Sequence, residues 1–140
     1  MIDSTTFANV IEKYRRRKYA LGDPSRGIDC ANILFGVYED LGLTLPQEFE
    51  GVTRESYADL FRSDPAKASA IFYRFLWSLG RSVEINFSVR GDLMIFKRRN
   101  EVFPGISLGG GNVLLVSEFG VLCVPLRAYK DHLVAVRRLL

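Results

Sequence analysis

One cysteine stands where a side chain could do chemistry, at the start of a predicted helix. The segment SRGIDCANILFGVYEDLGLTLP, residues 25–46, places Cys30 directly after Asp29, a residue type that caps helix starts. Backbone amides at a helix N-terminus favour a thiolate and can bind an oxyanion, which suits a nucleophile of acyl transfer. Buried cysteines are also common and usually inert, so the position alone does not establish catalysis.

A thiol nucleophile needs a group that takes its proton, and the sequence offers a single histidine. His132 falls in the predicted turn before the last strand, so we interpret it as a surface or structural residue. Asp29 adjoins Cys30, but a carboxylate there raises the thiol pKa. Cys30 and Cys123 form no CxxC pattern and have no nearby histidine, so we expect no metal and no cofactor.

In the N-terminal half, apolar residues recur every three to four positions, which is typical of helices. We expect a helix that begins at Ser4 or Thr5 and one that begins at Cys30 and ends at Gly42. We then expect a short helix over 53–61 and a longer helix after it. Asp64 and Pro65 suit the N-cap and the first residue of the longer helix. The longer helix carries a stripe of aromatic residues that suits packing better than ligand binding.

From Val83 onward the period becomes that of strands, separated by short glycine-containing turns. The expected strands cover 83–89, 92–98, 103–109, 112–118, 120–126 and 133–140. This order predicts a meander of antiparallel strands after the helices, which is the α+β class. The length of 140 residues predicts a single domain, 1–140.

Composition narrows the function classes. The chain is 48% hydrophobic and 25% charged with a net charge of +3, which is ordinary for a globular protein. No apolar run is long enough for a membrane span. The first residues lack the basic-then-apolar order of a secretory signal, so we expect the chain to be made in the cytoplasm. The basic run YRRRKY, residues 14–19, is interpreted as a solvated helix end, and we expect no nucleic-acid partner.

Residues around Cys30 carry a family resemblance. Tyr19, a glycine turn, the sequence Gly-Ile-Asp-Cys and the ending over 42–46 resemble the nucleophile motif of the NlpC/P60 cysteine peptidases. The segments RGDLMIF (90–96), FPGISLGGGNVLLVSEFGV (103–121) and PLRAYKDHLVAVRRL (125–139) are similar to the family's later strands. The resemblance covers 19–46 and 90–140 and leaves 47–89 as a helical insertion.

This resemblance implies a papain-like α+β fold, with N-terminal helices packed on an antiparallel sheet. Members cleave peptide bonds in bacterial peptidoglycan: the cysteine attacks, a histidine on the sheet is the base, and a polar residue on the next strand orients it. Carried over residue by residue, Cys30 is the candidate nucleophile, or its relic, and Tyr19 a supporting residue.

The chain departs from the family pattern at the other two catalytic positions. Phe103 stands where the base belongs, and Leu115 stands where the orienting residue belongs. The Ser-Gly that follows the nucleophile is Ala31-Asn32 here. Loss of one triad member costs about 10⁴ in rate. We expect both apolar side chains to pack against Cys30.

Three functional hypotheses follow. The first is a pseudoenzyme that acts as a structural or binding module. Similar stand-alone domains accompany tail-tip hubs of tailed phages, so this resemblance implies protein partners in a tail hub or baseplate, virion association, and peptidoglycan as a further ligand. The alternative is an active cell-wall hydrolase with a non-standard base. The third is a redox-sensing thiol protein, which requires a low thiol pKa at Cys30.

Overall fold

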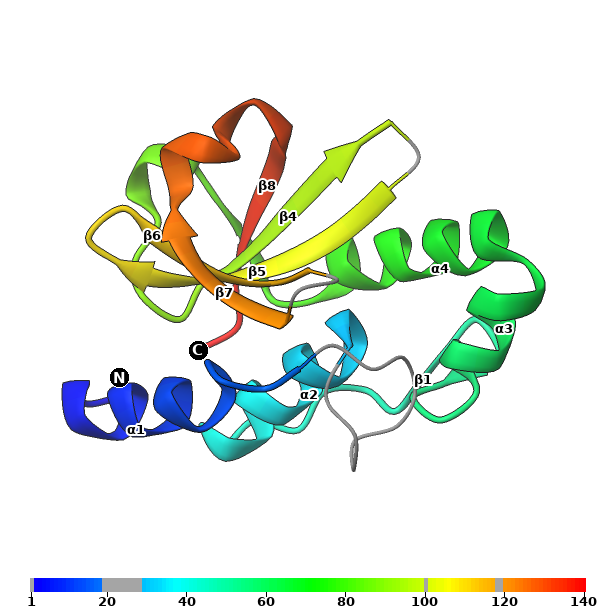
Figure 1. Ribbon diagram of the computed structural model, residues 1–140, viewed down its shortest axis with the longest axis horizontal. Coiled ribbons are helices and arrows are strands. Elements are labelled where there is room, and N and C mark those ends of the chain that lie inside the picture. Colours follow the sequence, from blue (N-terminus) through cyan, green and yellow to red (C-terminus); the bar gives the residue numbers. More distant parts are fainter. Residues whose placement is uncertain (1, 19–28, 100, 118–119) are drawn as a thin grey trace.

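Helices occupy the N-terminal half, as expected (Figure 1). The computed structural model describes residues 2–18, 29–99, 101–117 and 120–140. Within these residues, no helix is long and apolar enough to cross a membrane. The helices are α1 (Ser4–Tyr14), α2 (Cys30–Asp40), α3 (Tyr57–Ser63) and α4 (Pro65–Ser78).

Aspartates begin three of these helices. Asp3, Asp29 and Asp64 each accept a hydrogen bond from a backbone N–H in the first turn of α1, α2 and α4. The expected cap at Ser4 or Thr5 is therefore wrong by one residue, because the Asp3 carboxylate takes the free amide of Thr6 at 2.8 Å. Asp29 and Asp64 cap as predicted, with Pro65 as the first residue of α4.

Six antiparallel strands form the main sheet, in the order β3-β8-β4-β5-β6-β7. Strands β4 to β7 are the predicted meander, and the C-terminal strand β8 inserts between β3 and β4. A separate two-stranded hairpin, β1 (Glu48–Phe49) with β2 (Val52–Thr53), precedes α3. The strands of the main sheet are β3 (Arg81–Val83), β4 (Leu93–Arg98), β5 (Glu101–Gly109), β6 (Asn112–Ser117), β7 (Gly120–Pro125) and β8 (Leu133–Arg138).

Two expected elements have different bounds. The strand over 83–89 is largely wrong, because β3 ends at Val83 and Ile85–Phe87 form a 3₁₀ turn, η1. The apolar residues Ile85, Phe87 and Val89 are all exposed, Phe87 by 68%, so the alternating pattern here does not mark a buried face. The helix over 53–61 begins later, at Tyr57. Thr53 and Ser56 exchange side-chain-to-backbone hydrogen bonds, which fold 53–56 into a turn.

The main sheet buries apolar side chains on both faces. Along β4, Leu93 and Ile95 face the helices, and Met94 and Phe96 face the opposite side. Figure 1 shows α1, α2 and α4 on one side of the sheet, and residues of the short turns between β7 and β8 pack against the other face. We call the second face the aromatic core; its buried members are Met94, Phe96, Phe103, Val113, Leu115, Leu133 and Val136.

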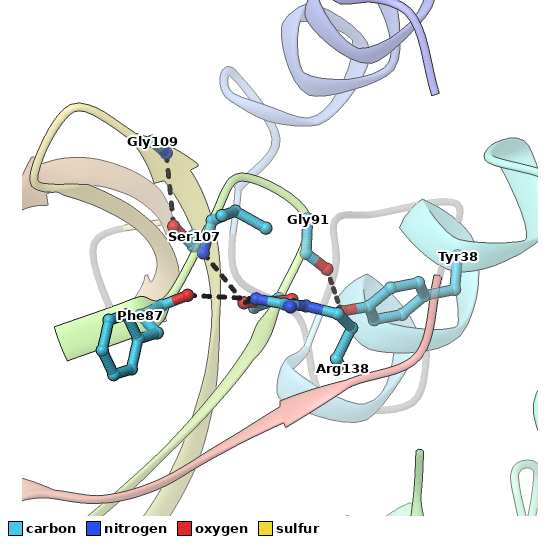
Figure 2. Close-up of polar contacts among 8 residues, drawn as sticks. Tyr38, Phe87, Gly91, Ser107, Gly109 and Arg138 are labelled. Carbon is cyan, nitrogen blue, oxygen red and sulfur yellow. Dashed lines mark hydrogen bonds and ion pairs between the residues drawn. The ribbon is translucent and has the colours of Figure 1, made fainter. Parts of the chain in front are cut away.

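A buried polar cluster joins α2, the turn before β4 and the end of β8. Figure 2 shows the Tyr38 hydroxyl pointing to the carbonyl of Gly91, to which it donates at 2.7 Å. Asp92, only 2% exposed, accepts from Arg138 Nε at 2.9 Å and Nη2 at 2.8 Å. The Arg138 guanidinium also donates to the Phe87 carbonyl at 3.1 Å. These contacts determine how the start of β4 and the end of β8 sit beside α2.

Replacing Asp92 with alanine is expected to destabilise the fold clearly. The substitution leaves the Val89 amide, 2.9 Å from the carboxylate, without its acceptor and takes the counter-charge from the Arg138 guanidinium, which keeps its hydrogen bond to the Phe87 carbonyl. The matched control is Asp59→Ala, which breaks the exposed Arg62–Asp59 pair. Such a pair contributes only about 0–1 kcal/mol. Urea unfolding measures both variants, and an equal loss in the two would contradict a structural role for the buried pair.

Candidate functional site

Cys30 is the first residue of α2, and its neighbours are held by the helix cap. The Asp29 carboxylate accepts from the Asn32 backbone N–H at 2.7 Å and from the Asn32 side-chain amide at 3.2 Å. Helix α2 contacts β5 and β6, the strands that carry the expected base and orienting positions. Cys30 itself stays partly exposed.

The positions expected for the base and the orienting residue are apolar and buried. Phe103 is 8% exposed, Leu115 is 2% exposed, and both belong to the aromatic core. The Phe103 ring stacks on Phe96 at 5.2 Å between ring centroids, and Tyr129 meets both rings edge-on. Cys30 packs against this same core. The structure thus places Cys30 against the cluster that contains Phe103 and Leu115, and direct contact of both side chains with Cys30 stays a prediction.

His132 lies in a turn before the last strand of the sheet. His132 ends a 3₁₀ turn, η3 (Lys130–His132), just before β8, which agrees with the predicted turn. Between described residues, no hydrogen bond links His132 to Cys30; the His132 backbone N–H donates to the carbonyl of Tyr129 at 3.0 Å. Tyr19 lies outside the described residues.

The surroundings of Cys30 work against a thiolate. Burial raises the pKa of the Cys30 thiol to about 12, and the negative charges of Asp29 and Glu101 add to the rise. The helix N-terminus, which by itself favours ionisation, is outweighed by this burial. At neutral pH the thiol therefore keeps its proton, and a redox role that needs a low thiol pKa is disfavoured.

An arginine on the other side of α2 was not identified from the sequence. Arg54 donates from Nε to the Asn32 side-chain oxygen at 2.9 Å and from Nη1 to Glu39 at 2.8 Å. Its guanidinium also lies 5.0 Å from the centroid of the Phe35 ring. Asn32 stands where the motif described in the sequence analysis has glycine. This departure was the one feature of the sequence that could have pointed to the hydrogen bond between Arg54 and Asn32. The network ties the segment after β2 to the first turn of α2.

A half-open pocket lies beside this network. The centre of a water molecule can occupy a volume of about 40 Å³ inside this pocket. The predicted aromatic stripe of α4 supplies part of its wall and also packs into the core. The lining residues come from α2, the β1–β2 hairpin, α3 and α4 and are Ala31, Phe35, Pro46, Gln47, Glu48, Phe49, Val52, Thr53, Arg54, Tyr57, Ile71, Phe72 and Phe75.

The two cysteines and the other potential metal ligands form no metal site and no disulfide within the described residues. In the described ranges, no three His, Cys, Asp or Glu side chains gather so that they could hold a metal ion. Cys30 and Cys123 are both free thiols. Cys123 lies on β7 and is exposed.

Solved structures match this arrangement of helices and sheet, although no protein-family model and no curated protein matches the sequence. An NlpC/P60 family protein from Bacillus cereus superposes with a TM-score of 0.68 over 99% of this chain, at 19% sequence identity. The chain has the NlpC/P60 fold. The fold resemblance expected from Cys30 and its neighbours is thereby confirmed. The chain spans 41% of the length of the Bacillus cereus protein.

Two further structures with the NlpC/P60 fold differ in what they do. The NlpC/p60 domain of the peptidoglycan hydrolase SagA matches with a TM-score of 0.64 at 18% identity, covering 98% of this chain and 99% of that domain. RipD from Mycobacterium tuberculosis, a non-catalytic NlpC/p60 domain protein adapted to peptidoglycan binding, matches at 0.63 and 18% identity, covering 99% and 100%. The fold therefore serves both hydrolysis and binding, and residues at the site must decide between them.

Proposed function

We propose that this chain is a catalytically inactive NlpC/P60-fold module that binds rather than cleaves. The observation that carries the proposal is that Phe103 and Leu115, which stand at the family's base and orienting positions, are both buried in the aromatic core against which Cys30 packs. A phenyl ring accepts no proton, and a leucine side chain orients no imidazole. Without a base, a thiol attacks an amide carbonyl too slowly for turnover.

The state of the thiol supports the same proposal. A raised pKa leaves Cys30 protonated, so the nucleophile is also missing at neutral pH. Cys30 then acts as a small apolar residue in the first turn of α2 that packs against the aromatic core.

Peptidoglycan is the ligand that we propose for this module. RipD combines the same fold with a non-catalytic, peptidoglycan-binding role, so loss of catalysis and retention of binding are compatible in this fold. We further propose a setting in a larger assembly, namely the tail hub or baseplate of a phage, on the sequence resemblance described above. Co-purification of the tagged chain with intact virions tests that setting, and its absence from purified particles would contradict it.

Purified chain incubated with peptidoglycan sacculi is expected to release no soluble muropeptides between pH 5 and pH 9. It is expected to sediment with the sacculi. Mass spectrometry of the supernatant measures release, and gel densitometry of the pellet measures binding. Cys30→Ala is the matched variant and is expected to behave as the wild type does in both assays.

The two readouts separate the two parts of the proposal. Muropeptide release that disappears in Cys30→Ala would show an active hydrolase and would overturn the pseudoenzyme. Chain that stays in the supernatant with intact sacculi would overturn peptidoglycan binding while leaving the inactivity in place. The NlpC/p60 domain of SagA, a peptidoglycan hydrolase, is the positive control for release.

A further inference from the structure

We propose that the pocket between α2 and the β1–α4 segment binds one apolar side chain of a partner peptide that carries a positive charge next to that side chain. We call it the α2–α4 pocket; its lining residues are those given above. The proposal goes beyond the proposed function, because it concerns a pocket that Cys30 does not line and holds whether or not the chain binds peptidoglycan.

Aromatic rings that brace one another form the walls. Phe75 stacks on Phe35 at 5.8 Å between centroids and meets Phe49 edge-on at 5.6 Å, and Tyr57 lies 5.3 Å from Phe72. Phe35, Phe72 and Phe75 are each about 95% buried, so the walls already belong to the core. The pocket therefore exists before any ligand arrives, and little order has to be gained on binding.

The size of the opening selects a single side chain. The volume open to the centre of a water molecule is about 40 Å³, and one water needs roughly 10–15 Å³ of such volume, so the pocket has room for more than one water. Apolar walls give such waters few hydrogen bonds, so an apolar group that displaces them gains free energy. Cofactor and drug sites are larger, about 300–1,000 Å³ and deeply enclosed. The pocket suits a phenyl ring or a branched aliphatic side chain.

Arg54 stiffens one lip of the pocket without leaving a free positive charge there. Its guanidinium is held by Asn32, Glu39 and the face of Phe35. The Glu39 carboxylate compensates the charge of Arg54 at 2.8 Å. An anionic ligand therefore finds no uncompensated cation at this lip.

Glu48 leaves a negative charge at the mouth. It lines the pocket and is exposed, and no ion pair or hydrogen bond of its carboxylate joins it to another described residue. Glu50, two residues on, is instead held by Arg74 at 2.6 and 2.8 Å. Because the charges of Arg54 and Glu50 are both compensated by partners, Glu48 determines the sign of the net charge at the mouth of the pocket. A lysine or arginine beside the inserted side chain meets this charge, and an acidic neighbour is repelled.

Three capped dipeptides test the pocket and its charge separately by NMR on the ¹⁵N-labelled full chain. N-acetyl-Phe-Lys-amide is expected to shift the backbone signals of Ala31, Thr53 and Tyr57 in a saturable way. N-acetyl-Phe-Glu-amide is expected to bind several-fold more weakly, and N-acetyl-Ala-Lys-amide is expected to cause no saturable shift. Saturable binding of the alanine peptide at these residues, or no shift with any peptide up to millimolar concentration, overturns the proposal.

Matched variants locate the contacts. Glu48→Gln is expected to weaken the Phe-Lys peptide by up to about fivefold and to remove its advantage over Phe-Glu, as for an exposed ion pair. Glu55→Gln is the control, because Glu55 is exposed but does not line the pocket. An unchanged preference in Glu48→Gln would overturn the role of the charge.

A third variant blocks the opening. Val52→Phe, at a half-buried lining position, is expected to abolish binding of the Phe-Lys peptide while the remaining spectrum stays that of a folded chain. Wild-type affinity in this variant would overturn the site. Its retention on sacculi is expected to be unchanged, so failure of the pocket and failure of peptidoglycan binding are distinguishable.

Discussion

Cys30 is expected to react with iodoacetamide far more slowly than an ordinary cysteine, with a rate that rises about tenfold for each pH unit from 7 to 10 and does not level off. The thiolate is the reacting species, and the pKa of Cys30 is raised to about 12. At pH 8.5 an ordinary thiol is about half ionised, so the thiolate fraction of Cys30 is roughly 10³-fold smaller. A more basic thiolate is a better nucleophile, which recovers part of this loss, while partial burial of the sulfur adds to it.

The chain contains its own control for this measurement. Cys123→Ser isolates Cys30, and Cys30→Ala isolates the exposed Cys123. We expect Cys30 to be slower by at least about 30-fold at pH 8.5. A plateau in the rate of Cys30 below pH 8 would reveal a stabilised thiolate and would revive the active-peptidase hypothesis. The raised pKa of Cys30 also makes the free energy of unfolding depend on pH. The folded chain favours the protonated thiol, so this contribution to stability is complete below about pH 8.5, the pKa of a thiol in the unfolded chain, and is lost as the pH rises toward 12.

Replacing Phe96 with alanine is expected to cost about 3–5 kcal/mol of unfolding free energy, as for other buried phenylalanines. The ring is fully buried, stacks on Phe103 with an interplanar angle of 7°, and meets Tyr129 edge-on. Its loss leaves a cavity next to the position where a catalytic base belongs. Total stabilities of domains are about 5–15 kcal/mol, so this is a large share of the whole.

Denaturant unfolding followed by circular dichroism measures the effect of Phe96→Ala. Phe87→Ala is the matched control, because that ring is 68% exposed and its truncation is expected to change the unfolding free energy by no more than about 0.5 kcal/mol. A loss below about 1 kcal/mol in Phe96→Ala would mean that the aromatic core collapses around the missing ring. Phe103 would then not be held rigidly in the aromatic core.

Local chemistry made several elements predictable. Asp29 and Asp64 cap their helices as expected, and Gly42, with a φ of +93°, follows α2 in the left-handed conformation that glycine adopts at low cost. The meander over β4 to β7 was predictable because each of its hairpins joins neighbours in sequence. The segment 83–89 was mispredicted as a strand, because its alternating apolar residues predict a half-buried strand, whereas the tertiary structure leaves Ile85, Phe87 and Val89 exposed.

The sequence by itself determined the order of most helices and strands and the position of Cys30 at the start of a helix, because caps, period and residue type are local properties. The assignment of Phe103 and Leu115 to the base and orienting positions follows from the resemblance to the NlpC/P60 motif. Only the tertiary structure decided the insertion of β8 beside β4, the high pKa of Cys30 and the α2–α4 pocket. Each of these arises between segments far apart in the chain. Desolvation of a thiol and enclosure of a pocket depend on which distant side chains meet there, and no local pattern encodes that meeting.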